Sequence, residues 1–322
     1  MYSKTLENFK KIDIDILRPQ GFLQKETEWN RKSYQSVVDG NGFKEIGICP
    51  ICKNKDYSIE FTKFDIDIYG CKRCGHRYSS KIPNNVEDVY SDDEYLPQAI
   101  DTAHKTSDYR KQRFGKERFE LIKKFCNGNK LLDIGCGTGY YLEIAIQNNF
   151  DAYGQELGKD VAKWTREHLG ITIWDKPIDK IQTDIRFDVI TIFDVIEHVI
   201  NPIEFILNAK KLLANNGIML ILTPNFDSVA ISIMKEQSQV ICPPSHLQFF
   251  TYNSIKKLAE QVDMDLMYIQ TNGIDLADLK SYYEFIGNES MSKMCYFFYD
   301  ILQPTIDASN AGNHFKFILK KR

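Results

Sequence analysis

Residues 131–139 have the sequence LLDIGCGTG, and this stretch decides the fold that we expect for the chain. The apolar residues before the glycines predict a buried strand. Gly135, Gly137 and Gly139 predict a sharp turn, because glycine adopts backbone conformations that other residues avoid. A helix is expected over 140–147, so the turn joins a strand to a helix. Ligands of parallel sheets bind at such turns.

Strands and helices alternate along the rest of the chain. Apolar runs predict strands at residues 130–134, 151–156, 171–174, 187–193, 218–223, 266–270 and 314–319. Apolar positions at helical spacing predict helices at residues 104–126, 140–147, a segment ending near 168, 202–213 and 254–262. Such alternation implies an α/β fold, in which helices cover both faces of a parallel sheet.

The glycine spacing and two acids indicate which ligand the turn binds. The pattern is G-x-G-x-G rather than the G-x-G-x-x-G of dinucleotide-binding proteins. Asp133, at the entrance of the turn, would repel a pyrophosphate but suits a ligand with positive charge. Glu156, at the end of the next strand, can accept hydrogen bonds from both hydroxyls of a ribose. We therefore expect S-adenosylmethionine, which carries an ammonium and a sulfonium and no phosphate, rather than NAD.

Four of the eight cysteines form the pattern C-x2-C-x18-C-x2-C, at Cys49, Cys52, Cys71 and Cys74. Two residues between thiols let one turn direct both sulfurs at one metal ion, and this spacing is typical of a structural Zn2+ site. Short strands expected within the segment between the two pairs favour a zinc ribbon. Two separate redox pairs are the alternative, although no thioredoxin-like unit surrounds them.

The composition excludes several classes of protein. The 322 residues include 41 Lys and Arg against 44 Asp and Glu, a net charge of −3, so no overall basic field would draw the chain to nucleic acid or to an anionic membrane. Apolar runs are far shorter than the roughly 18 residues of a membrane-spanning helix. The first residues, MYSKTLE, lack the apolar core of a signal peptide, so we expect a cytoplasmic protein.

Taken together, these motifs resemble those of the class I S-adenosylmethionine-dependent methyltransferases. Residues 133–139 match the first motif of that family, 187–199 its fourth-strand segment and 216–225 its fifth. The resemblance implies a Rossmann-like, seven-stranded, mostly parallel sheet, in which the last strand, 314–319, inserts antiparallel. The residues that it implies for cofactor binding are Asp133, Gly135, Cys136, Gly137, Gly139, Glu156, Asp175, Phe193 and Asp194.

With the ribbon included, the chain resembles zinc-ribbon methyltransferases of bacterial glycan and secondary-metabolite gene sets. This resemblance implies O-methylation of a small molecule, such as a nucleotide-linked or glycan sugar. Two alternatives stay open: an RNA methyltransferase whose ribbon docks on RNA, and a non-catalytic binding module. Residues 1–80 hold fourteen Lys and Arg against eleven Asp and Glu, a smaller excess than RNA docking normally shows. The intact glycine turn argues against a mere binding module.

Two histidines are candidates for the general base that a hydroxyl acceptor needs. His246 follows the fifth strand and is the first choice, the alternative being a helix cap or a contact to a substrate hydroxyl. His198, expected at the start of the helix after the fourth strand, is the second choice, and it can instead shape the cofactor pocket. Asp194, Glu197 and His198 form D-x-x-E-H, which resembles an Mg2+-binding pattern of ubiquinone-type O-methyltransferases. Ordinary hydrogen bonding at a helix start is the alternative.

These interpretations divide the chain into four parts. We expect an arm at residues 1–44, the zinc ribbon at 45–80, a helical lid or linker at 81–128 and the methyltransferase domain at 129–322. Within the last part, an insertion at about 226–311 is expected to build the acceptor pocket. If the ribbon is a separate module, removal of zinc should unfold it and leave the cofactor affinity largely intact.

Overall fold

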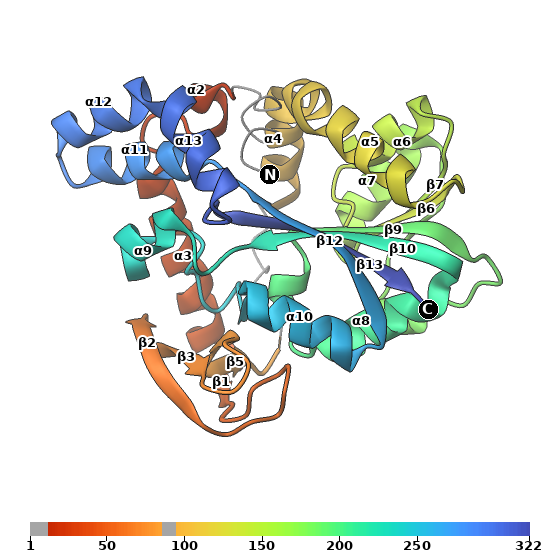
Figure 1. Cartoon of the computed structure of the whole chain (residues 1–322), viewed down its shortest axis with the longest axis horizontal. Helices are drawn as coiled ribbons and strands as arrows, with labels where there is room; N and C mark the ends of the chain where they lie inside the picture. Colours follow the sequence, from red (N-terminus) through yellow and green to blue (C-terminus); the bar gives the residue numbers. More distant parts are fainter. Residues whose placement is uncertain (1–11, 86–94) are drawn as a thin grey trace.

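The computed structural model describes residues 12–85 and 95–322, and its centre is a seven-stranded sheet (Figure 1). The strand order is β12-β13-β10-β9-β6-β7-β8. The last five strands in this order run parallel, and β13 is antiparallel to both of its neighbours. This is the predicted Rossmann-like arrangement, so the fold class is confirmed. The strands are β6 (Lys130–Ile134), β7 (Asp151–Gln155), β8 (Ile173–Trp174), β9 (Phe187–Phe193), β10 (Leu213–Pro224), β12 (Met264–Asn272) and β13 (His314–Lys321).

Helices cover both faces of the sheet, because its central strands carry apolar side chains on both sides. On one face lie α5 (Lys116–Phe125), α6 (Tyr140–Gln147) and α7 (Lys159–Leu169). On the other face lie α8 (Pro202–Leu212) and α10 (Tyr252–Gln261) (Figure 1). These two layers leave the carboxyl ends of the parallel strands at one edge of the sheet, where the predicted site residues gather.

The start of α8 corrects one expectation. His198 does not begin a helix; it ends a short 3-10 turn, Ile196–His198, and α8 begins only at Pro202. Proline suits the first position of a helix because its ring already has the helical φ and its missing N–H needs no partner there. The side chain of Asn201 caps this start by accepting a hydrogen bond from the backbone N–H of Glu204.

The cysteine motif lies in a small antiparallel unit, which we call the ribbon (residues 43–83). Its strands are β1 (Phe43–Glu45), β2 (Tyr57–Lys63), β3 (Ile66–Cys71), β4 (Arg77–Ser79) and β5 (Lys81–Pro83). β1 pairs with β5, so the strand pairing begins and ends slightly outside the predicted bounds of 45–80. The sheet β2-β3-β4 continues into a fourth strand, β11 (Gln248–Phe249), which comes from much later in the chain, after β10.

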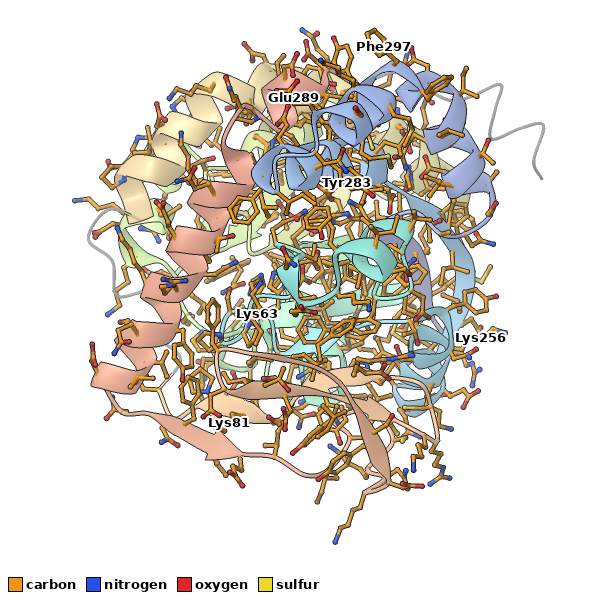
Figure 2. All side chains as sticks on the ribbon, turned by 90° about the vertical axis from the view of Figure 1, so that its left-hand side faces the viewer. Lys63, Lys81, Lys256, Tyr283, Glu289 and Phe297 are labelled. Carbon is orange, nitrogen blue, oxygen red and sulfur yellow. The ribbon has the colours of Figure 1, made fainter. Side chains whose placement is uncertain are left out.

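Several helices that the sequence reasoning did not place form a second cluster, the helical cap. It consists of α2 (Ile14–Leu17), α9 (Val229–Met234), α11 (Asp275–Phe285), α12 (Glu289–Phe297) and α13 (Tyr299–Ala308). The long helix α3 (Phe22–Asp39) runs from this cap to the ribbon, as Figure 2 shows with Tyr283 labelled in the cap and Lys81 in the ribbon. Part of the predicted arm therefore packs on part of the predicted insertion.

The segment before the first strand of the large sheet is helical, as predicted. It consists of α4 (Tyr95–Arg110), a π-helical turn (Lys111–Gly115) and α5. Parts of the predicted arm and of the predicted lid, residues 1–11 and 86–94, lie outside the described residues. Among the helices that the structure describes, none is long and apolar enough to span a membrane.

Candidate active site

The glycine turn is built as the sequence predicts, between β6 and α6. Gly135, Gly137 and Gly139 all have a positive φ, of 70°, 52° and 77°. A Cβ on Gly135 would lie 2.3 Å from Cγ2 of Val195, so any side chain at this position would clash with Val195. A Cβ on Gly137 would meet no atom within 4 Å. The turn therefore opens to free space at Gly137, where a ligand can approach the backbone.

Glu156 faces this turn from the end of β7. Its Oε2 accepts a hydrogen bond from the backbone N–H of Gly137 at 3.0 Å, and its Oε1 accepts one from Gly158 at 2.8 Å. Burial raises the pKa of this carboxyl, whereas these backbone hydrogen bonds lower it. The acid and the open glycine lie next to each other, as a site for a ribose beside a strand-to-helix turn requires.

Asp133 lies deeper than the sequence suggests. It is 3% exposed, and Thr191 on the neighbouring strand β9 donates a hydrogen bond from Oγ1 to its Oδ1 at 2.6 Å. Burial raises the pKa of Asp133 to about 7, against the lowering effects of Thr191 and of the Arg118 guanidinium. A cation bound at the turn would favour the ionised form of this carboxyl.

Arg118 is a site residue that sequence reasoning missed. It lies on α5, and its guanidinium is 4.3 Å from the ring centre of Phe193 and donates a hydrogen bond to the Tyr140 hydroxyl at 2.9 Å. It is buried, and its charge acts on both Asp133 and Asp194. An arginine among the apolar positions of a predicted helix was the available signal, because such a side chain is rarely buried without a partner.

The other predicted cofactor residues have different surroundings. The thiol of Cys136 is buried against Gly154 of β7, so this residue offers the site its backbone rather than its sulfur. Asp194 follows β9 with φ 55°, and its Oδ1 lies 3.8 Å from Nε2 of His314. Asp175 directly follows β8, is exposed and pairs with Arg166 at 3.4 Å.

The structure brings the two candidate histidines together. The rings of His198 and His246 meet edge to face with centroids 4.6 Å apart. Nδ1 of His198 donates to the carbonyl of Ser245, and Nδ1 of His246 donates to that of Val240, each at 2.9 Å. Burial lowers the pKa of both imidazoles. A carbonyl oxygen only accepts, so each Nδ1 carries the proton. Nε2 is then the basic nitrogen of a neutral His246, whereas the His198 ring has a further backbone hydrogen bond to Asp194.

The predicted Mg2+ ligands are not assembled as a set. Glu197, His198 and His246 offer ligand atoms that lie within 4.8 Å of one another, and Asp194 is not in this group. Two imidazoles and one carboxylate suit Mg2+ poorly, because this ion prefers oxygen ligands and keeps several waters. The residues do not fit the predicted Mg2+ site.

The four ribbon cysteines do converge. Their sulfurs lie within 4.8 Å of one another, with Cys49 and Cys74 at 3.6 Å and Cys52 and Cys71 at 3.5 Å. A tetrahedral zinc ion with Zn–S bonds of about 2.3 Å would place its sulfurs about 3.8 Å apart. The donor set and its spacing are thus compatible with zinc.

A family model described as "Methyltransferase domain" matches residues 105–268, just over half of the chain. The ubiquinone biosynthesis O-methyltransferase of Caulobacter sp. (strain K31) is 32% identical over 115 residues, which cover 34% of this chain and 46% of that protein. The enzyme of the same name from Glaesserella parasuis serovar 5 is 34% identical over 109 residues, covering 30% and 46%. The chain thus spans about half the length of the curated relatives that it matches.

One solved structure illustrates the shared fold. It is the complex between the Haloferax volcanii Trm112 methyltransferase activator and the putative methyltransferase. The match has a TM-score of 0.50 at 12% identity and covers 71% of this chain and 98% of that chain. At this identity the likeness concerns the fold alone.

Proposed function

The chain belongs to the methyltransferase family whose domain matches residues 105–268, and we propose that it transfers a methyl group from S-adenosylmethionine to a small molecule. The observation that carries this proposal is the pairing of the open glycine turn at Gly137 with the Glu156 carboxylate. The backbone of the turn and Glu156 would hold the nucleoside. Asp133 would favour a cationic ligand, and Phe193 and Asp194 border the same edge of the sheet.

S-adenosylmethionine supplies a methyl group on a positively charged sulfur, so the protein has to place an acceptor in line with that carbon and exclude water. The proposed base is His246, whose Nε2 would accept the proton of an acceptor hydroxyl. The hydrogen bond from its Nδ1 to Val240 fixes the tautomer that this step needs. His198, in edge-to-face contact with it, would hold the acceptor or the base in place.

We propose a hydroxyl of a nucleotide-linked or glycan sugar as the acceptor. The resemblance to zinc-ribbon glycan methyltransferases supports this choice, and the curated relatives bear the name O-methyltransferase. The cap helices at residues 275–308 would cover the acceptor, since these residues lie outside the matched methyltransferase domain.

The acceptor class can be tested directly. The purified protein is incubated with S-adenosylmethionine labelled in its methyl group and with fractionated cell extract. We expect the label to enter a nucleotide-sugar or glycan fraction, as a methyl ether that survives mild base. Label in a phenolic fraction would keep methyl transfer but overturn the sugar acceptor. Label in RNA, with less incorporation as the salt concentration of the assay rises, would overturn the small-molecule acceptor.

We also propose that the four ribbon cysteines bind one zinc ion. We expect about one zinc per chain by elemental analysis, and its loss from Cys49→Ser and Cys71→Ser, because a serine oxygen replaces a thiolate in a four-ligand site. Cys126→Ser is the matched control: this half-buried cysteine lies outside the cluster, and the variant should keep its zinc. A native protein without metal would contradict the zinc site.

A further inference from the structure

We propose that the ribbon positions His198 and His246, and that Gln248 is the residue that connects them to it. This inference rests on the proposed function, because it gives the ribbon a part in methyl transfer. The segment 245–249 lies between the ribbon on one side and the loop 197–200 on the other. His246 belongs to this segment, and His198 belongs to the loop.

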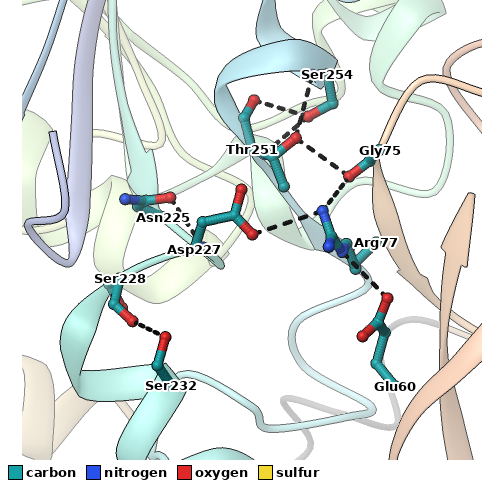
Figure 3. Close-up of polar contacts among 9 residues, drawn as sticks. All are labelled: Glu60, Gly75, Arg77, Asn225, Asp227, Ser228, Ser232, Thr251 and Ser254. Carbon is teal, nitrogen blue, oxygen red and sulfur yellow. Dashed lines mark hydrogen bonds and ion pairs between the residues drawn. The ribbon is translucent and has the colours of Figure 1, made fainter.

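The segment is bound to the ribbon along its length. β11 pairs antiparallel with β4, with Gln248 opposite Tyr78. The backbone N–H of Ser79 donates to the carbonyl of Leu247 at 3.0 Å. Just beyond the strand, the Thr251 hydroxyl donates to the carbonyl of Gly75 at 3.1 Å (Figure 3). Residues 247–251 therefore form one structural unit with the ribbon rather than a neighbouring module.

The same segment is bound to the loop that carries His198. His198 donates its Nδ1 proton to the carbonyl of Ser245 at 2.9 Å. The backbone N–H of Leu247 donates to the carbonyl of Glu197 at 2.8 Å. His198 contacts Ser245 directly, and His246 lies between Ser245 and Leu247, the two residues that bind the loop. A shift of residues 245–249 would therefore move both rings.

Gln248 joins the ribbon to the loop through a single side chain, which is 1% exposed. Its Nε2 lies 3.0 Å from the carbonyl oxygen of Val199 and 3.4 Å from that of Ile200. Because carbonyl oxygens only accept, the amide group must donate there. The amide oxygen therefore faces Nε2 of His76, at 2.9 Å, and accepts its proton.

His76 ties this contact to the cysteine cluster. Its carbonyl accepts a hydrogen bond from the backbone N–H of Cys71 at 2.8 Å, and its side chain is fully buried. Its ring packs against Phe250, with centroids 5.0 Å apart. A continuous path thus leads from the second cysteine pair through His76 and Gln248 to Val199, the residue after His198. Gln248 is a positioning residue, because it acts through the histidines and not on the substrate.

The test measures the tautomers of the two histidines by NMR, and this measurement needs no acceptor substrate. Histidine side-chain NMR at pH 7.5 should show both His198 and His246 protonated on Nδ1 in the native protein, with signals assigned by His198→Gln and His246→Gln. In Gln248→Ala we expect at least one of these rings to become a mixture of tautomers, with zinc content unchanged and affinity for S-adenosylmethionine within about twofold. With the acceptor that the labelling experiment identifies, the rate of methyl transfer should fall about 10- to 100-fold, mainly through kcat.

Asp227→Asn is the matched control at the same junction. Asp227 pairs with Arg77 of the ribbon at 3.6 Å, and its side chain is 53% exposed (Figure 3). This variant weakens a contact between the ribbon and the rest of the chain that does not lead to either histidine. It should leave both tautomers and kcat unchanged.

If Gln248→Ala does not fold, Gln248→Glu keeps an acceptor for His76 and loses the amide donor to Val199, and the same change in tautomers is expected. Native tautomers in a folded variant that lacks this donor would overturn the proposal. A native protein that binds no S-adenosylmethionine would sink the proposed function instead, and the NMR comparison would still decide whether the ribbon positions the two rings.

Discussion

Gly137→Arg is expected to raise the dissociation constant for S-adenosylmethionine about 100-fold or more. The native residue has φ 52° and no atom within 4 Å of the place where a Cβ would lie, so a long side chain would fill the proposed cofactor site without displacing the protein around it. The backbone strain of a non-glycine residue in this conformation costs about 1–2 kcal/mol, which lowers the melting temperature by only a few degrees. Calorimetric titration of the folded variant measures the effect.

Gly42→Arg provides a control with the same backbone strain. Gly42 also has a positive φ, of 68°, and no atom within 4 Å of its Cβ position, but it directly precedes β1 of the ribbon rather than lying in the glycine turn. We expect it to keep the native affinity while losing similar stability. Equal affinity in the two variants would show that Gly137 does not border the cofactor.

His246→Ala is expected to lower kcat about 100- to 10,000-fold and to leave the affinity for S-adenosylmethionine within about twofold. This range is the usual contribution of a general base, and the imidazole contacts His198 and Phe249 rather than the glycine turn. His168→Ala is the matched control, because this half-exposed histidine at the end of α7 lies away from the pair. A kcat of His246→Ala near the native value would remove His246 from the chemistry.

The pH dependence of kcat should report the protonation of His246. Burial is the largest cause that lowers the pKa of His246 well below its usual 6.5, and a proton on the neighbouring His198 would lower it further by repulsion. The basic form is therefore present above that lowered pKa and is lost as the pH falls through it. We expect kcat to stay constant from pH 8 to 6.5 and to decline only at more acidic pH. A decline centred at or above 6.5 would contradict a half-buried neutral base.

The central fold followed from local patterns in the sequence. β6, α6 and β9 lie at the predicted residues, because continuous apolar runs and a glycine turn specify a buried strand and its exit with little help from the rest of the chain. The convergence of the four cysteines was predictable for a similar reason: two short C-x2-C pairs constrain the geometry locally. The edge of the sheet where Glu156 and Asp194 lie followed from parallel topology.

The connections between distant segments could not be predicted in this way. Nothing in the two residues of β11 indicates that they pair with β4, some 170 positions earlier, because a strand so short has no periodicity of its own. The helices of the cap have many aromatic and polar residues at mixed spacing, and they bring α2, from the start of the chain, together with α11 to α13, from near its end. The position of Arg118 among apolar residues of a helix indicates burial, but its partners Tyr140 and Phe193 come from other elements and could not be predicted.

Calorimetric titration of the native protein with S-adenosylmethionine and, separately, with NAD measures which of the two ligands the glycine turn binds. We expect saturable binding of S-adenosylmethionine with one site per chain and no heat from NAD, because the glycine turn and its two acids suit a cationic nucleoside without phosphate. Binding of NAD with no binding of S-adenosylmethionine would contradict this expectation.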